Sequence, residues 1–265
     1  QKAATPYSWH KELFEYANAL GMLAFSSPFD EAAVDFLDGL NVPCFKIASF
    51  ELTDIPLIRK AASTKKPLII STGMASLSEI ELAVTTAKHA GCDDIILLKC
   101  TSTYPAEPAN TNLITISHMS NAFQCPVGLS DHTGGIGVAV SSVALRAPVI
   151  EKHFVLDRSA GGVDAAFSLE PCELEALVNE TKRAWQALGR VTYGGSQAED
   201  KAKQYRRSIY VSNDIAPGEI LGTHNLKIVR PAFGLAPKHW DSVIGKRSTG
   251  VLKKGTALGW EHIAQ

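Results

Sequence analysis

The 265-residue chain lacks any apolar run long enough to cross a membrane, and it has no excess of charge of one sign. A membrane helix needs about 18 consecutive apolar residues, whereas the best candidate here, Ile95 to Leu98, suits a buried strand. Residues 1–9 show no basic and then apolar signal pattern. The formal net charge of −1 gives no overall field that would attract nucleic acid. We therefore expect neither a membrane nor a nucleic-acid partner.

Paired cysteines and nucleotide-binding glycine motifs are also missing. The five cysteines are an odd number and lack the spacing of a zinc site. This usage predicts reduced, mostly buried thiols and a cytoplasmic location. No Gly-x-Gly-x-x-Gly follows a predicted strand, so the sequence gives no support to a dinucleotide-binding fold.

The chain does contain a repeat of strand, loop and helix. Six apolar runs predict strands, and these cover residues 22–26, 44–48, 68–71, 94–99, 127–129 and 148–152. Helices are predicted after them, over residues 31–37, 56–62, 77–90, 112–119, 137–145 and 171–188. This alternation indicates a parallel sheet, either open and doubly wound or closed into a β/α barrel. Because a closed barrel has eight strands, we expect two further strands to precede Gln1.

The pattern changes near residue 190. Residues 191–205 are polar and contain glycine, which predicts a linker. Short strand-like runs follow at 208–211 and 227–229, separated by several glycines. We expect a barrel domain over residues 1–190, a linker over 191–205 and a small, mostly β or irregular domain over 206–265.

Polar side chains follow every predicted strand of the repeat. In a parallel barrel the functional site lies at the carboxyl ends of the strands. The groups found there are hydroxyls, cations, imidazoles and a carboxylate: Ser26, Ser27, Lys46, Ser49, Glu51, Ser71, Thr72, Lys99, Ser102, Tyr104, Ser130, His132, Lys152 and His153. Hydroxyls and lysines form strong charge-assisted bonds to phosphate and carboxylate. The pattern therefore predicts a site for a small polyanion.

His132 and His153 follow neighbouring predicted strands. Neighbouring strands lie ~4.8 Å apart, so two imidazoles at matching heights can hold one ion. Two histidines without cysteine suit Mn²⁺ or Mg²⁺, or Zn²⁺, with carboxylates and water completing the shell. The alternative is a pair of hydrogen-bonded histidines with no metal. Glu51 and Asp164 are candidate carboxylates for substrate binding or proton transfer.

Several of these stretches resemble sialic acid synthases in order and spacing. They are Lys46-Ile47-Ala48-Ser49 with Glu51, Ser71-Thr72-Gly73-Met74, Cys100 to Pro105, Gly128 to Thr133, and Glu151 to Phe154. Arg230-Pro231, Gly234-Leu235 and Gly245-Lys246 resemble the antifreeze-like, or SAF, domain of that family. Within the family, four stretches look more like pseudaminic acid synthase: Gly161 to Asp164, Phe167 to Pro171, Arg206 to Ser208 and Arg230 to Trp240.

This resemblance implies a TIM-type (β/α) barrel with a C-terminal SAF domain, and a reaction. Phosphoenolpyruvate condenses with an N-acetylated amino sugar, of the 2,4-diacetamido-2,4,6-trideoxy-altrose type, to a nine-carbon 2-keto acid with release of phosphate. The residues that match phosphoenolpyruvate contacts are Ser27, Lys46, Ser49, Ser71, Ser102 and Ser130. Those that match sugar contacts are Glu51, Tyr104, Asp164 and Arg230. His132 and His153 match the ligands of a divalent metal, Mn²⁺ or Mg²⁺, and act in catalysis with Lys46 and Glu51.

The resemblance also implies a domain-swapped homodimer in which the partner subunit supplies Arg230. Three alternatives stay open. In the first alternative, the acceptor is N-acetylmannosamine or a legionaminate precursor, which makes the chain a neuraminate or legionaminate synthase. In the second alternative, the chain is a non-catalytic sugar-binding protein with a decayed barrel. The third alternative is a Schiff-base aldolase that uses Lys99 or Lys152.

Overall fold

The computed structural model describes residues 5–264, which form two compact units that divide between Gly189 and Arg190. In this part of the chain, no helix is both long and apolar enough to cross a membrane. All five cysteines are free thiols. Each unit is described by itself below.

The first unit is built on a five-stranded parallel sheet. Its strands are β1 (Phe45–Ile47), β2 (Leu68–Ser71), β3 (Ile95–Cys100), β4 (Val127–Asp131) and β5 (Ile150–Lys152). They lie side by side in the order in which they occur in the sequence. A doubly wound sheet reverses its strand order at a switch point, and this sheet does not. The order therefore excludes the doubly wound alternative and agrees with the predicted barrel class.

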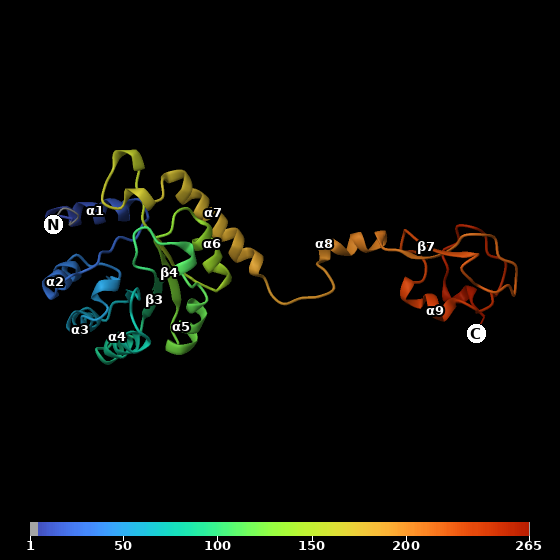
Figure 1. Ribbon diagram of the computed structural model, residues 1–265, viewed down its shortest axis with the longest axis horizontal. Coiled ribbons are helices and arrows are strands. Elements are labelled where there is room, and N and C mark those ends of the chain that lie inside the picture. The colour runs from blue at the N-terminus through green and yellow to red at the C-terminus, as the bar shows by residue number, and fades with distance from the viewer. Residues whose placement is uncertain (1–4, 265) are drawn as a thin grey trace. The chain divides into compact units, whose positions relative to one another are not determined.

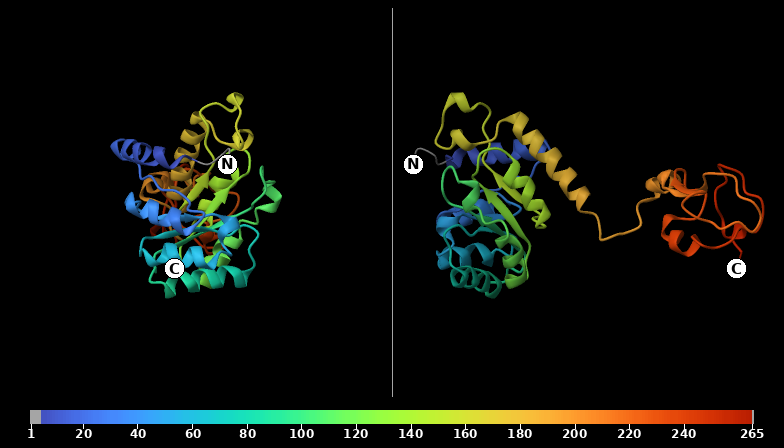
Figure 2. Two further views of the ribbon diagram at one scale, coloured as in Figure 1. Left: turned by 90° about the vertical axis from the view of Figure 1, so that its left-hand side faces the viewer. Right: turned by 45° about the vertical axis from the view of Figure 1, so that its right-hand side comes forward.

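Seven helices accompany the sheet, and Figures 1 and 2 show α2 to α7 following one another in an arc around the strands. Their bounds are α1 (Tyr7–Ala19), α2 (Glu31–Gly39), α3 (Ile55–Ser63), α4 (Leu77–His89), α5 (Thr115–Phe123), α6 (Gly137–Ala144) and α7 (Pro171–Leu188). Local signals set several starts: Asp30 caps α2, and Ser76 with Glu79 forms the predicted capping box of α4. Neighbouring helices pack on one another, as α2 does on α3 and α6 on α7.

The sheet is strongly curled. Five strands in a flat sheet would separate β1 from β5 by about 19 Å, four spacings of ~4.8 Å. Yet Lys46 Nζ on β1 lies 3.4 Å from Glu151 Oε2 on β5. The two side chains meet across the concave face, which is the geometry of a barrel wall. The convex face carries the core, where buried Phe45, Leu68 and Leu97 pack with residues of the surrounding helices.

The second unit is small and mostly irregular. Strands β6 (Ser208–Val211) and β7 (Leu226–Val229) pair antiparallel. Isolated bridges such as Ile215 to Leu252 and Ile220 to Arg247 extend this pairing. A separate apolar core, including Ile209 and Leu258, lies at its centre. The short helix α9 (Trp240–Val243) completes the unit.

The structure differs from the sequence-based predictions in several places. Residues 22–26 are not a regular strand, because among the described residues only Ser26 bonds to the sheet, its carbonyl accepting from Lys46 N at 3.4 Å. The predicted linker 191–205 contains a helical turn, α8 (Gln197–Asp200), followed by a 3₁₀ segment over Lys201–Tyr205. Helix α1 was not predicted from the sequence. Its N-terminus has no side-chain cap and no acidic residue in its first turn, so the usual start signals are absent.

Candidate functional site

A hydrogen-bonded network crosses the concave face of the sheet. Lys46 Nζ donates to Ser71 Oγ at 2.8 Å and faces Glu151, whose Oε1 accepts from Ser130 Oγ at 2.6 Å. These four residues come from β1, β2, β4 and β5. Lys46, Ser71 and Ser130 are each buried. A cation and two hydroxyls thus converge on one spot, as an anion site requires.

Beside this network lies a close approach of backbone and hydroxyls at Gly73. Its N–H donates to Ser49 Oγ at 3.1 Å. A Cβ on this glycine would lie only 2.0 Å from Ser102 Oγ and 2.8 Å from Ser49 Oγ. Only glycine leaves this space open, so Ser49, Gly73 and Ser102 form a small polar cradle. We call these three residues the serine cradle.

The two predicted histidines are in contact range. The centroids of the His132 and His153 rings lie 5.1 Å apart, with the planes at 60°. His132 Nδ1 lies 3.0 Å from the carbonyl oxygen of Thr101, and His153 Nδ1 lies 3.5 Å from Asp164 Oδ2. Anchoring one ring nitrogen to a carbonyl or carboxylate is typical of metal-binding histidines.

Aromatic rings enclose the histidine pair. Tyr104 lies 4.5 Å from the His132 ring, and Phe167 lies 5.0 Å from the His153 ring, measured between centroids. Phe167 is buried, whereas Tyr104 is 46% exposed. Buried Phe167 therefore closes one side of the pair, and the partly exposed ring of Tyr104 covers His132.

The surroundings move the pKa values of the two imidazoles in opposite directions. Burial lowers the pKa of His132, but bonding to Cys100 and to the Thr101 carbonyl outweighs burial and raises it above the ordinary value. Burial and the neighbouring His132 lower the pKa of His153. Burial raises the pKa of Cys100, but hydrogen bonds with His132, Ser49 and Ser102 outweigh it and bring the value to about 7.

Glu51 holds a buried oxygen with no hydrogen-bond partner. Its Oε2 is the one buried side-chain oxygen or nitrogen left unpaired among residues 5–264. Burial raises the pKa of this carboxyl. An unpaired buried acceptor is costly unless a proton or a ligand meets it. Glu51 belongs to the 3₁₀ turn Ser49–Glu51, next to the serine cradle.

The remaining predicted residues are placed as follows. Asp164 is half-buried beside His153. Ser27 is half-buried in the loop before α2 and lines a different cavity, with His10 and Asp30. Arg230 is an exposed residue of the second unit. No cluster of three or more His, Cys, Asp or Glu side chains suited to a metal occurs within residues 5–264.

Both lysines of the aldolase alternative are engaged. Lys152 Nζ pairs with Asp131 at 2.8 Å, and Lys99 Nζ donates to the Cys100 carbonyl at 2.9 Å.

The structure also adds two residues to which the sequence had assigned no role, Glu151 and Cys100. Glu151 is the register partner of Ser130 across β4 and β5, so strand alignment was the signal that could have found it.

Comparisons with known proteins agree with this fold. Residues 1–193 match the NeuB family, and residues 206–264 match the SAF domain. Pseudaminic acid synthase of Helicobacter pylori is 39% identical over 264 residues, covering 99% of this chain and 78% of that protein. N,N'-diacetyllegionaminic acid synthase of Legionella pneumophila is 40% identical over 259 residues, covering 96% and 73%.

A solved structure of a sialic acid synthetase is also similar to this chain. The N-acetylneuraminic acid synthetase of Leptospira borgpetersenii, in complex with citrate, superposes with a TM-score of 0.71 at 36% identity, over 76% of this chain and 70% of that one. The resemblance to sialic acid synthases that the ordered motifs carried is confirmed. With a family match over most of its length and relatives near 40% identity, this chain belongs to the NeuB family and carries a C-terminal SAF domain.

Proposed function

We propose that this chain condenses phosphoenolpyruvate with an N-acetylated amino sugar to a nine-carbon 2-keto sugar acid, with release of phosphate. The acceptor we propose is 2,4-diacetamido-2,4,6-trideoxy-altrose, which makes the product pseudaminic acid. One observation carries the proposal: the His132 and His153 rings, 5.1 Å apart, share the mouth of the sheet with the network of Lys46 and Ser71.

The proposed reaction balances as follows. C3 of phosphoenolpyruvate bonds to the aldehyde carbon of the open-chain sugar, and the aldehyde oxygen takes a proton. Water adds at C2, and the C–O bond to phosphate breaks, which leaves the 2-keto group. Lys46 with Ser49, Ser71, Ser102 and Ser130 is proposed to hold phosphoenolpyruvate, and Ser27, which lines a different cavity, is left out of this set. Fixed donors of this kind stabilise the charge of a departing phosphate.

A divalent cation, Mn²⁺ or Mg²⁺, fits the donor set of the histidine pair. An imidazole that binds a metal at ~2.1 Å has its centroid about 3.2 Å from the ion, so two such ligands have centroids about 4.5–5.3 Å apart. The observed 5.1 Å lies in that range. A cation held there would supply Lewis-acid polarisation of the aldehyde oxygen. His132 and His153 would hold it, with water or substrate as the further ligands.

The sugar is proposed to lie against Glu51, Tyr104 and Asp164. The unpaired Oε2 of Glu51 needs a donor, and a sugar hydroxyl or amide provides one. Asp164 lies beside His153, and Tyr104 covers His132, so both can contact an acceptor at the histidine pair.

We also propose that the reaction takes place in the cytoplasm. Five free cysteines are consistent with a reducing compartment.

The assay that tests the proposal measures Mn²⁺-dependent phosphate release from phosphoenolpyruvate with three acceptors. These are the altrose-type diacetamido sugar, the legionaminate precursor and N-acetylmannosamine. We expect the first to give the highest kcat/KM. A preference for either of the other two keeps the chemistry and changes the product, which the similarity to a legionaminic acid synthase makes a real alternative. If the chain releases no phosphate with any acceptor but still binds the sugar, the result would favour the alternative of a non-catalytic sugar-binding protein.

We propose a domain-swapped homodimer in which the partner's Arg230 contacts the sugar. The test mixes a Lys46→Met chain with an Arg230→Ala chain at a low phosphoenolpyruvate concentration, at which each variant alone is expected to show little activity. If the arginine comes from the partner, half of the dimers have one intact site, and about a quarter of wild-type activity returns. If each chain uses its own arginine, mixing restores nothing.

Filling the serine cradle is expected to impair phosphoenolpyruvate binding. Gly73→Ala would place a methyl group 2.0 Å from Ser102 Oγ and 2.8 Å from Ser49 Oγ. The two hydroxyls must shift, and a misplacement of about 1 Å costs about 10²-fold in kcat/KM. Steady-state kinetics with phosphoenolpyruvate as the varied substrate measure this. The exposed Gly134, whose Cβ would meet nothing within 4 Å, gives the matched control Gly134→Ala. Equal kinetics for both variants would contradict the cradle.

The acid limb of the pH profile is expected to depend on Cys100. A neutral imidazole is the form that binds a metal or accepts a proton. Because the pKa of His132 is raised, activity should fall as the pH drops through a value above 6.5. Cys100→Ala removes a cause of the raised pKa, so the limb should move to lower pH. The measurement is kcat/KM against pH for both proteins, and a limb that stays in place or moves upward would rule out this coupling.

A further inference from the structure

A buried ion pair lies behind the two histidines, on the side of the sheet that faces the helices. Lys152 Nζ donates to Asp131 Oδ2 at 2.8 Å, and the side chains are 4% and 0% exposed. The two residues are register partners at the ends of β4 and β5. Each immediately precedes one of the histidines, and successive side chains of a strand point to opposite faces.

Thr133 joins this pair and fixes the other side of His132. Asp131 Oδ1 accepts from Thr133 N at 2.9 Å and from Thr133 Oγ1 at 2.8 Å. Lys152 Nζ also donates to the carbonyl oxygen of Thr133. Thr133 is fully buried. The backbone on both sides of His132 is therefore tied to the residue that precedes His153.

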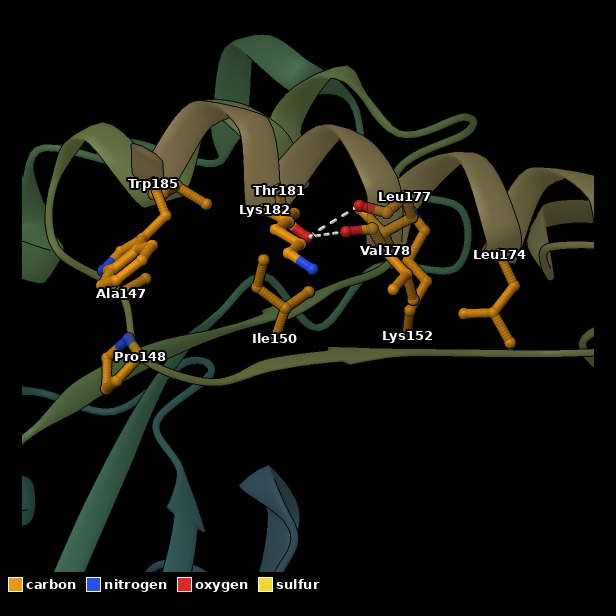
Figure 3. A pocket seen from close by; sticks show the side chains of 11 residues that line it. Ala147, Pro148, Ile150, Lys152, Leu174, Leu177, Val178, Thr181, Lys182 and Trp185 are labelled. Atoms are coloured by element: carbon orange, nitrogen blue, oxygen red, sulfur yellow. Dashed lines mark hydrogen bonds between the residues drawn. The ribbon is translucent and has the colours of Figure 1, made fainter. Parts of the chain in front are cut away.

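Most of the side chains around Lys152 are apolar. Lys152 lines a cavity of about 600 Å³ beneath α7, together with Ile150, Leu174 and Leu177 (Figure 3). Removing two charges from water is unfavourable, and packed hydrophobic residues often replace a buried ion pair without loss of stability. Stability alone therefore gives no reason for charges at this place. Directional bonds that fix the ends of two strands do give one.

We propose that Asp131, Thr133 and Lys152 are positioning residues, which hold the His132 and His153 imidazoles at the spacing needed to share a divalent cation. The cation itself rests on the proposed function, but the ring geometry can be tested without turnover. Groups that support metal ligands from behind typically change metal affinity or activity by about 10–100-fold when they are removed.

The test compares three variants of the full chain. Asp131→Asn keeps the shape and removes the charge, Thr133→Val removes only the hydroxyl, and Thr133→Ser retains it. We expect Mn²⁺ affinity, measured by calorimetry, to fall about 10–100-fold in Asp131→Asn, to fall less in Thr133→Val and to stay near wild type in Thr133→Ser. The ring proton signals of His132 and His153, recorded by NMR in the metal-free chain, should shift in the first two variants only.

Ile58→Ala is the control for general destabilisation. Ile58 is fully buried in α3, in the core between the sheet and its helices. This variant should lower the melting temperature while Mn²⁺ affinity and both ring signals stay as in the wild type. If Asp131→Asn and Thr133→Val behave like Ile58→Ala, the positioning role is wrong.

Three further outcomes also bear on the positioning role, the proposed metal and the proposed reaction. If Asp131→Asn does not fold, the difference between Thr133→Val and Thr133→Ser carries the test. If the wild type shows no Mn²⁺ binding, the proposed metal fails, and the ring signals alone test the positioning. If the wild type binds Mn²⁺ but releases no phosphate from phosphoenolpyruvate, the proposed reaction fails while the inference keeps its own readouts.

Discussion

Replacing His132 or His153 with alanine is expected to lower kcat by about 10²–10³-fold, the range seen when one group that stabilises developing charge is removed. Both imidazoles are proposed to hold the same cation, and their centroids lie 5.1 Å apart. Because they act as a unit, the double variant should be little worse than either single one. Phosphate release at saturating Mn²⁺ and substrates measures the effect.

The matched control is His89→Ala. His89 is an exposed residue in the last turn of α4 and belongs to no part of the proposed site. It should retain wild-type kcat. Single histidine variants that keep most of their activity, or effects that simply multiply in the double variant, would mean that the two rings do not share one ion.

Lys46→Met is expected to raise the KM for phosphoenolpyruvate by about 10²-fold or more, because a buried charge-assisted contact to the substrate anion is lost. Lys46 is 7% exposed and is the cation that meets Ser71 and Glu151. Without it, Glu151 also repels the incoming anion. The KM for the sugar should change far less, since the lysine lies on the phosphoenolpyruvate side of the proposed site.

Lys66→Met is the control for this prediction. Lys66 also forms an ion pair, with Asp38 at 2.9 Å, but on the outside of the unit. Surface pairs contribute little to stability, so this variant should keep both KM values. An equal rise of both KM values in Lys46→Met would indicate general damage and not a lost phosphoenolpyruvate contact.

Much of the barrel could be predicted from local signals. The strand predicted over residues 68–71 coincides with β2, because a short apolar run between polar turns has few other uses. The helix predicted over residues 171–188 coincides with α7, since Pro171 opens it and Gly189, at φ +48°, closes it. Such boundaries depend on residues next to them in the sequence.

The predicted elements differ from the structure where something other than the apolar pattern determines the local conformation. Residues 22–26 are apolar enough for a strand, but a strand also needs a paired neighbour, which the sequence of the segment cannot reveal. Helix α5 begins at Thr115 and not at residue 112, because Asn112 has φ +45° and cannot enter a helix. The capping box of Ser196 and Glu199 was a usable signal for α8 within the expected linker.

The site divides in the same way. The rule that strand ends face one another was enough to expect Lys46, Ser71, Ser130 and the two histidines together. It could not predict that Glu151 reaches across the curled sheet to Lys46, since that contact depends on the curvature. Nor could it predict the opposite pKa shifts of His132 and His153, which depend on burial and on contact with Cys100.

Pulsed EPR of the Mn²⁺-loaded chain with phosphoenolpyruvate tests the central claim most directly. If His132 and His153 hold the cation beside the phosphoenolpyruvate site, the spectrum should show couplings to two imidazole nitrogens and to one phosphorus nucleus. His132→Ala should remove one of the two nitrogen couplings. Mn²⁺ that binds without any histidine coupling, or with a spectrum unchanged in His132→Ala, would contradict the account.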